Sequence, residues 1–206
     1  MKMKLFKTIG SSILACSALG FNANAIAAVT VINENFNAIL VTSPDNYEQI
    51  GYGSVQTLGA FDATDVDLIK VPFYGAISGN SVDLNGSTQG SLVTSFSTIL
   101  GNIYTLTFDY GTNSVDNTTF NVKFGTNGPV SLISGIFGGS NSSYTATFFG
   151  TGNTETLSFT STFSGASGSV VDNVLVTSAI PEPGEWAMMI AGLGVVGLMV
   201  RRRRAN

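Results

Sequence analysis

The chain has 206 residues, of which 44% are hydrophobic and 11% are charged. It contains no histidine and one cysteine, so the usual general base and a disulfide framework are both missing. Between residues 29 and 180, Lys70 and Lys123 stand against eleven acidic residues, a net charge of −9. Such a surface repels nucleic acid, and we expect no nucleic-acid partner.

The N-terminus predicts a secretory signal peptide over residues 1–28. Lys2, Lys4 and Lys7 precede an apolar stretch that ends in small residues, the order that the secretory machinery reads. Cys16 lies inside this segment, and a lipoprotein signal around it is the less favoured alternative. The expected signal peptidase region contains Ala23, Ala25, Ala27 and Ala28.

Residues 29–178 predict one all-β domain. The stretches "YTLTFDY" at 104–110 and "TFNVKFG" at 119–125 alternate polar and apolar residues, as strands do. Turns rich in Gly and Asn, such as "GTNGP", separate these stretches at short spacing and indicate an antiparallel sandwich or barrel. The stretch "SPDNYEQI" at 43–50 predicts at most one helical turn, opened by Pro44.

The body offers little for catalysis. No G-x-S-x-G occurs, neither body lysine lies in an S-x-x-K context, and the acidic residues include no pair that the sequence singles out as glycosidase carboxylates. We therefore expect a protein that is not an enzyme.

Two acidic stretches are candidate ligand sites. "DATDVD" brings Asp62, Asp65 and Asp67 together, and oxygen-rich loops hold Ca²⁺, but the Gly and distal Glu of an EF-hand are missing and a solvated turn is favoured. "DLNG", beginning at Asp83, favours a turn at a strand end over ligand contact.

Several aromatic residues flank glycines or turns. They could form a platform on which sugar rings stack, although the rim of the core is the favoured interpretation. These residues are Tyr52, Phe73, Tyr74 and Tyr110.

The central stretch resembles the choice-of-anchor group of secreted proteins, which overlaps a galactose-binding-like jelly-roll family. The resemblance rests on "SGNSVDLNG" at 78–86, "YTLTFDY" at 104–110 and "VVDNVLVT" at 170–177. It implies adjacent terminal strands and a structural Ca²⁺ held by Glu34 and Asp172. The alternative is that each carboxylate caps a turn through hydrogen bonds.

The C-terminus predicts a short transmembrane helix over residues 186–200. This run contains no charged residue, and as a helix it would reach about 22 Å against roughly 30 Å of bilayer core. Trp186 is placed as an interfacial aromatic, and four arginines follow as a cytoplasmic anchor.

Residues 179–206 resemble a PEP-CTERM sorting signal. The resemblance rests on Pro181, Glu182, Pro183 and Trp186, followed by the apolar run and Arg201, Arg202, Arg203 and Arg204. It implies an exosortase as partner, which recognises and removes the tail after a transient stay in the inner membrane. The mature protein would then reach the cell surface or the extracellular matrix.

These patterns together predict an exported, non-catalytic surface or matrix protein, sorted by an exosortase and associated with exopolysaccharide and biofilm. The alternative is a carbohydrate-binding module with a structural calcium ion, and a glycan-processing enzyme is less favoured still. No cofactor other than calcium is expected.

Overall fold

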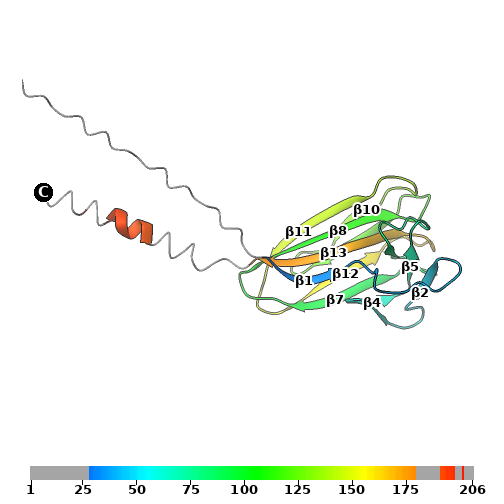
Figure 1. Cartoon of the computed structure of the whole chain (residues 1–206), viewed down its shortest axis with the longest axis horizontal. Coiled ribbons are helices and arrows are strands. Elements are labelled where there is room, and N and C mark those ends of the chain that lie inside the picture. Colours follow the sequence, from blue (N-terminus) through cyan, green and yellow to red (C-terminus); the bar gives the residue numbers. More distant parts are fainter. Residues whose placement is uncertain (1–27, 180–190, 198–200, 202–206) are drawn as a thin grey trace, which may run out of the picture.

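The computed structural model describes residues 28–179, residues 191–197 and residue 201. Residues 28–179 form two antiparallel sheets packed face to face (Figure 1). The predicted all-β sandwich of jelly-roll type is therefore confirmed. The alternating residues identified in the sequence lie in strands, because each strand buries one face in the core.

The seven-stranded sheet has the order β11-β8-β13-β6-β5-β2, with β1 also paired to β13. Its strands are β1 (Ala28–Glu34), β2 (Tyr47–Ile50), β5 (Val66–Lys70), β6 (Asn80–Asp83), β8 (Ile103–Thr112), β11 (Ser142–Phe149) and β13 (Ser169–Ala179).

The six-stranded sheet has the order β10-β9-β12-β7-β4-β3. Its strands are β3 (Gln56–Leu58), β4 (Phe61–Thr64), β7 (Ser91–Ser97), β9 (Thr119–Phe124), β10 (Val130–Ile133) and β12 (Thr154–Ser161).

Phenylalanines from both sheets fill the space between them. Phe108 on β8 meets Phe159 on β12 edge to face, with ring centroids 4.9 Å apart. Phe61 lies 6.0 Å from the same ring. All three side chains are fully buried, and a buried aromatic of this size contributes several kcal/mol to stability.

The body begins and ends at the same end of the sandwich, opposite to β2 and β5 (Figure 1). Ala28 pairs with Ala179 across β1 and β13. The first strand begins at Ala28 and the last strand ends at Ala179. The eleven residues of β13 separate the two ends of the sandwich by about 35 Å.

The helical turn expected within residues 43–50 is wrong. Pro44 and Asp45 form a turn, and Tyr47–Ile50 continue as β2, paired with β5. The Glu48 Oε1 atom accepts hydrogen bonds of 2.6 Å from both the Thr42 amide and the Thr42 hydroxyl. These bonds, together with the pairing to β5, hold the segment extended.

The C-terminal tail is described only in part. Residues 191–197 form a helix, which lies within the segment predicted as transmembrane. In the described part of the chain, no helix has the length and apolar character needed to cross a bilayer. Several predicted residues lie outside the described residues: Ala23, Ala25, Ala27, Pro181, Glu182, Pro183, Trp186, Arg202, Arg203 and Arg204.

Candidate ligand-binding site

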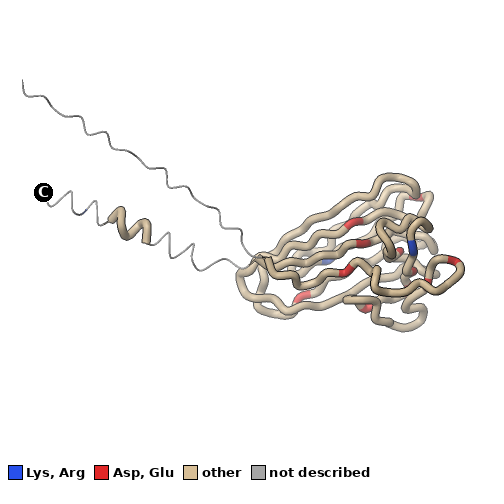
Figure 2. The backbone as a smooth tube through the Cα atoms, viewed as in Figure 1, with Lys and Arg blue, Asp and Glu red and all other residues tan. Residues whose placement is uncertain are grey.

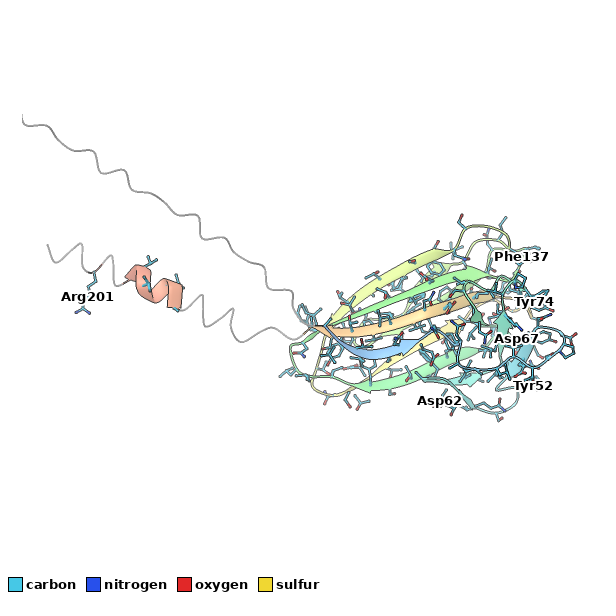
Figure 3. All side chains as sticks on the ribbon, viewed as in Figure 1. Tyr52, Asp62, Asp67, Tyr74, Phe137 and Arg201 are labelled. Carbon is cyan, nitrogen blue, oxygen red and sulfur yellow. The ribbon has the colours of Figure 1, made fainter. Side chains whose placement is uncertain are left out.

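A cavity of about 290 Å³ lies on the outer face of the seven-stranded sheet. On β5, Val66 and Leu68 point into the core, so Asp67 and Ile69 point to the opposite face and form the cavity floor. Tyr74 and Asp67 lie at the end of the sandwich away from the chain ends (Figure 3). The lining comprises Tyr47, Gln49, Asp67, Ile69, Tyr74, Gly86, Ser87, Asn113, Ala166 and Ser167.

Strand register places a polar row across the floor. Gln49 on β2 pairs with Asp67 on β5, which in turn pairs with Asp83 on β6. Directly opposed residues in an antiparallel sheet project from the same face, with Cβ atoms about 5 Å apart. Two aspartates, 16 positions apart in the sequence, are thus neighbours on the outer face.

Asp67 lacks a hydrogen-bond partner at one oxygen. Its Oδ1 atom is buried, and no donor among the described residues reaches it. Burial and, to a smaller extent, the nearby Asp65 carboxylate together raise the pKa of Asp67 to about 6. The Asp67 carboxylate, which lines the cavity, can therefore accept hydrogen bonds from a donor group on a ligand.

Asp83 is fully buried but well supplied with donors. Its oxygens accept hydrogen bonds from the amides of Asn85 and Gly168, both at 3.0 Å, and from the Asn113 side chain at 2.9 Å. Burial nevertheless raises the pKa of Asp83 to about 7, because these bonds only partly offset the loss of solvent. Asp83 therefore helps to hold the loops that wall the cavity.

Asp65 holds Gln49 and Ser87, which line the cavity, through hydrogen bonds. Its Oδ1 atom accepts hydrogen bonds of 3.0 Å from the Ser87 amide and from the Gln49 side chain, and Thr88 donates to Oδ2. Burial acts to raise the pKa of Asp65, but the hydrogen bonds from Thr88, Ser87 and Gln49 outweigh it and lower the pKa. Asp65 thus stays ionised beside Asp67.

Two tyrosines form the aromatic wall. The rings of Tyr47 and Tyr74 meet edge to face with centroids 5.6 Å apart, and each side chain is 36% exposed. Tyr74 has a φ of 55°, a left-handed conformation that is unfavourable for a tyrosine. The following Gly75 also has a positive φ, and a Cβ there would lie 2.4 Å from the Thr112 carbonyl oxygen. The backbone around Tyr74 is therefore closely constrained.

A second hollow of about 220 Å³ lies on the other side of the same loop. Gly75 and Ala76 line it, as does Phe137, which is half exposed. The Ser134 hydroxyl in its wall is buried and has no partner among the described residues. The loop that carries Tyr74 thus separates two adjacent depressions.

The predicted aromatic platform forms only in part. Tyr74 lines the cavity and Phe73 packs against Tyr74 without lining it, whereas Tyr110 packs against Phe108 and Phe120 of the core. Tyr52 is 66% exposed and does not line the cavity. Tyr47 was missed, because residues 47–50 were not recognised as a strand; alternation in "YEQI" places Tyr47 and Gln49 on one face.

The three carboxylates of "DATDVD" do not share one loop. Asp62 is exposed on β4 of the six-stranded sheet, while Asp67 lies on β5 of the other sheet. Asp65 occupies the crossing between them. The segment passes from one sheet to the other, so its three carboxylates are not grouped as the less favoured alternative of a calcium loop requires.

The "DLNG" stretch supports neighbouring loops. Besides the contacts of Asp83, the Asn85 side chain donates to the carbonyl oxygens of Phe163 and Gly165 at 2.7 and 2.6 Å. The Ser161 hydroxyl donates to Asn85 at 2.6 Å. These bonds are those of a turn that anchors the loop at residues 162–168.

Glu34 and Asp172 lie on adjacent terminal strands, with Glu34 opposite Val174. Glu34 accepts hydrogen bonds from the amides of Phe36 and Ala60, at 2.8 and 2.9 Å. Burial raises the pKa of Asp172, although Ser78, Asn173 and Ser81 donate to its oxygens. Within the described ranges, no three His, Cys, Asp or Glu side chains are grouped to hold a metal ion. Calcium binding by this pair stays a prediction.

Comparison with known proteins identifies the tail. Residues 179–204 match the PEP-CTERM protein-sorting motif, which indicates an exported protein. A comparison with curated protein sequences finds no match.

Similar solved structures are β-domains of low sequence identity. A family 35 carbohydrate binding module from Clostridium thermocellum is 15% identical (TM-score 0.40; 63% of this chain, 96% of that chain). CBM35 from Cellvibrio japonicus Abf62 is 10% identical (TM-score 0.44; 73% and 92%). The CBM36-1 domain of a xylanase from the hindgut metagenome of Trinervitermes trinervoides is 17% identical (TM-score 0.42; 66% and 100%). These similarities concern the fold alone.

Proposed function

We propose that this is an exported protein of the cell surface or extracellular matrix, sorted by an exosortase, whose sandwich binds a glycan of the surrounding exopolysaccharide. The sorting motif at residues 179–204 carries the first part of the proposal. The N-terminal segment, with its lysines and small residues, supports export through the secretory machinery.

The cavity over β2, β5 and β6 supports glycan binding. Tyr47 and Tyr74 offer aromatic faces for the C–H groups of a sugar ring, and Gln49, Asp67 and Asn113 offer groups for its hydroxyls. The second hollow, across the loop of Tyr74, supports a ligand with more than one sugar unit. We propose binding without turnover, because the body has no histidine or cysteine.

The placement of the cavity also favours this function. The sorting tail follows Ala179, and the cavity lies at the opposite end of the sandwich. While the tail holds the body at the membrane, the cavity can therefore face away from the membrane.

Replacing Pro181, Glu182 and Pro183 by alanine tests sorting. We expect the variant to accumulate in the membrane as an uncleaved precursor, whereas Pro44→Ala, in an exposed turn, should be processed normally. The measurement is immunoblotting of membrane and medium fractions. Normal release of the triple variant would contradict exosortase sorting and would leave the binding proposal untouched.

Glycan arrays with the full chain, purified in detergent, test binding. We expect bound glycans for the wild type and for Tyr52→Ala, and loss of signal for Tyr74→Ala. Parallel arrays in EDTA and in calcium test the calcium prediction, since a requirement for calcium would support it. An array without any bound glycan in either condition would overturn glycan binding.

The alternative of a glycan-processing enzyme has its own test. Purified protein is incubated with the bound polysaccharide, and new reducing ends are measured. We expect none; steady release that Asp67→Asn abolishes would replace the binding proposal with an enzymatic one.

A further inference from the structure

The lining of the cavity includes the acidic residue Asp67 but no basic residue. Asp67 lies on its floor, and Asp65 and Asp83 flank Asp67. Lys70 and Lys123 are the basic residues of the body, and neither lines the cavity. Acidic positions outnumber basic ones over the whole sandwich (Figure 2). A cation that balances Asp67 would therefore have to come from outside the domain.

The three carboxylates differ in their supply of donors. Asp65 and Asp83 each accept hydrogen bonds from backbone amides and from an amide side chain. The buried Oδ1 atom of Asp67 accepts none from the described residues. Because the Asp67 carboxylate lines the cavity and has the fewest donors of its own, an ammonium group gains more from donating to it than from contacting the other two.

We propose that the cavity binds the protonated amine of an amino sugar, with the ammonium group donating to the carboxylate of Asp67 and the sugar ring lying against Tyr47 and Tyr74. This inference rests on the proposed glycan binding and names the class of sugar.

The surroundings favour an amine over the other groups of a glycan. A hydroxyl donates one hydrogen bond and no charge, whereas an ammonium donates three and compensates Asp67. Tyrosine faces attract cations. Carboxylated or sulfated sugars would meet Asp65 and Asp67 without a basic partner, so they should be excluded.

The inference includes a pH dependence. The titratable groups that face Asp67 are Asp65, Asp83, Tyr47 and Tyr74, and the pKa of Asp67 is about 6. As the pH rises from 5 to 7, Asp67 loses its proton and its attraction for an ammonium group grows. Affinity for the free amine should therefore rise until the sugar amine begins to lose its own proton near neutral pH, while affinity for an acetylated sugar should change little.

The test compares two tetrasaccharides of one linkage, β-1,4-linked glucosamine and its fully N-acetylated counterpart. Isothermal titration calorimetry uses the full chain in detergent at pH 7. We expect the free amine to bind at least about tenfold more tightly, as charge-assisted hydrogen bonds do. Asp67→Asn should abolish this difference and Asp67→Glu, which keeps the charge, should retain part of it. Asp62→Asn, the same change at an exposed position of the other sheet, should match the wild type.

Two other outcomes would contradict the amine inference. Equal affinity of the wild type for the two sugars would overturn the amine inference and leave glycan binding standing. Binding of lysine peptides but of neither sugar would overturn both. The comparison of sugars on the wild type needs no variant, so misfolding of Asp67→Asn would not obscure it.

Discussion

The two ends of the sandwich differ in chemistry although the same strands connect them. At the end where β1 begins and β13 finishes, Leu100 and Phe149 are 77% and 70% exposed and the loops carry few ionisable groups. At the opposite end, Asp67, Tyr47 and Tyr74 line a cavity. Figure 3 shows Asp67 and Tyr74 at this end. The shared core supports both ends, and the loops give each end its own surface.

The proposed function places the sorting tail at one end of the sandwich and glycan recognition at the other. The ends are about 35 Å apart along β13, well beyond the range over which substitutions usually couple. Changes at one end should therefore leave the property of the other end intact, and the predictions below test that independence.

Phe159→Ala should have the largest effect, because it removes a fully buried ring that contacts both Phe61 and Phe108. We expect a loss of about 3–5 kcal/mol in the free energy of unfolding, measured by urea denaturation. Phe149→Ala removes the same ring at an exposed position and should cost less than about 0.5 kcal/mol. Equal losses for the two variants would contradict the description of the core.

The buried aspartates should make stability depend on pH. Folded Asp83 keeps its proton up to about pH 7, and Asp67 keeps its proton up to about 6, whereas both ionise near 3.8 when unfolded. The folded state thus binds more protons over this range, so the free energy of unfolding should fall as the pH rises from about 4 to about 7. Asp83→Asn should reduce this fall by roughly 2–4 kcal/mol, measured by urea titrations from pH 4 to 8. Asp62→Asn should run parallel to the wild type, and a flat wild-type curve would contradict the burial of Asp83.

Gly75→Ala should distort the loop that holds Tyr74. Its φ of 70° and a Cβ 2.4 Å from the Thr112 carbonyl oxygen combine backbone strain with a clash against backbone. We expect a cost of roughly 2–3 kcal/mol and a weakened glycan signal on arrays. Gly53→Ala has a similar φ of 72° but open space around it, so it should cost about 1 kcal/mol and leave binding unchanged. Identical behaviour of the two variants would argue against the packed loop.

Tyr47→Ala should have the smallest effect, confined to binding. Loss of one aromatic wall should weaken glycan affinity about threefold to tenfold, measured by calorimetry. Tyr52→Ala changes a tyrosine that is exposed nearby but does not line the cavity, and its affinity should stay within twofold of the wild type. A larger loss for Tyr52→Ala than for Tyr47→Ala would move the site away from the cavity.

Local pattern was sufficient to predict the fold class and the sorting tail. Alternation in "YTLTFDY" predicts a strand because the side chains of successive strand residues point to opposite faces, and that strand is β8. The sorting motif can be recognised from the order of its parts along the chain: the Pro-Glu-Pro triplet, the apolar run and the arginines. This recognition does not depend on tertiary structure. The family resemblance implies that β1 and β13 are adjacent, but their register comes from the structure alone.

The cavity depended on tertiary structure. Gln49, Asp67 and Asp83 are neighbours only because three strands pair in one register, and Asn113 reaches the same place from a distant loop. The sequence by itself determined that this chain makes strands and carries a sorting motif, because both depend on residues that are close together in the sequence. Only the packing of strands and loops decided which aspartate lacks a hydrogen-bond donor and which tyrosines lie beside it. Burial and strand pairing depend on residues that are far apart in the chain.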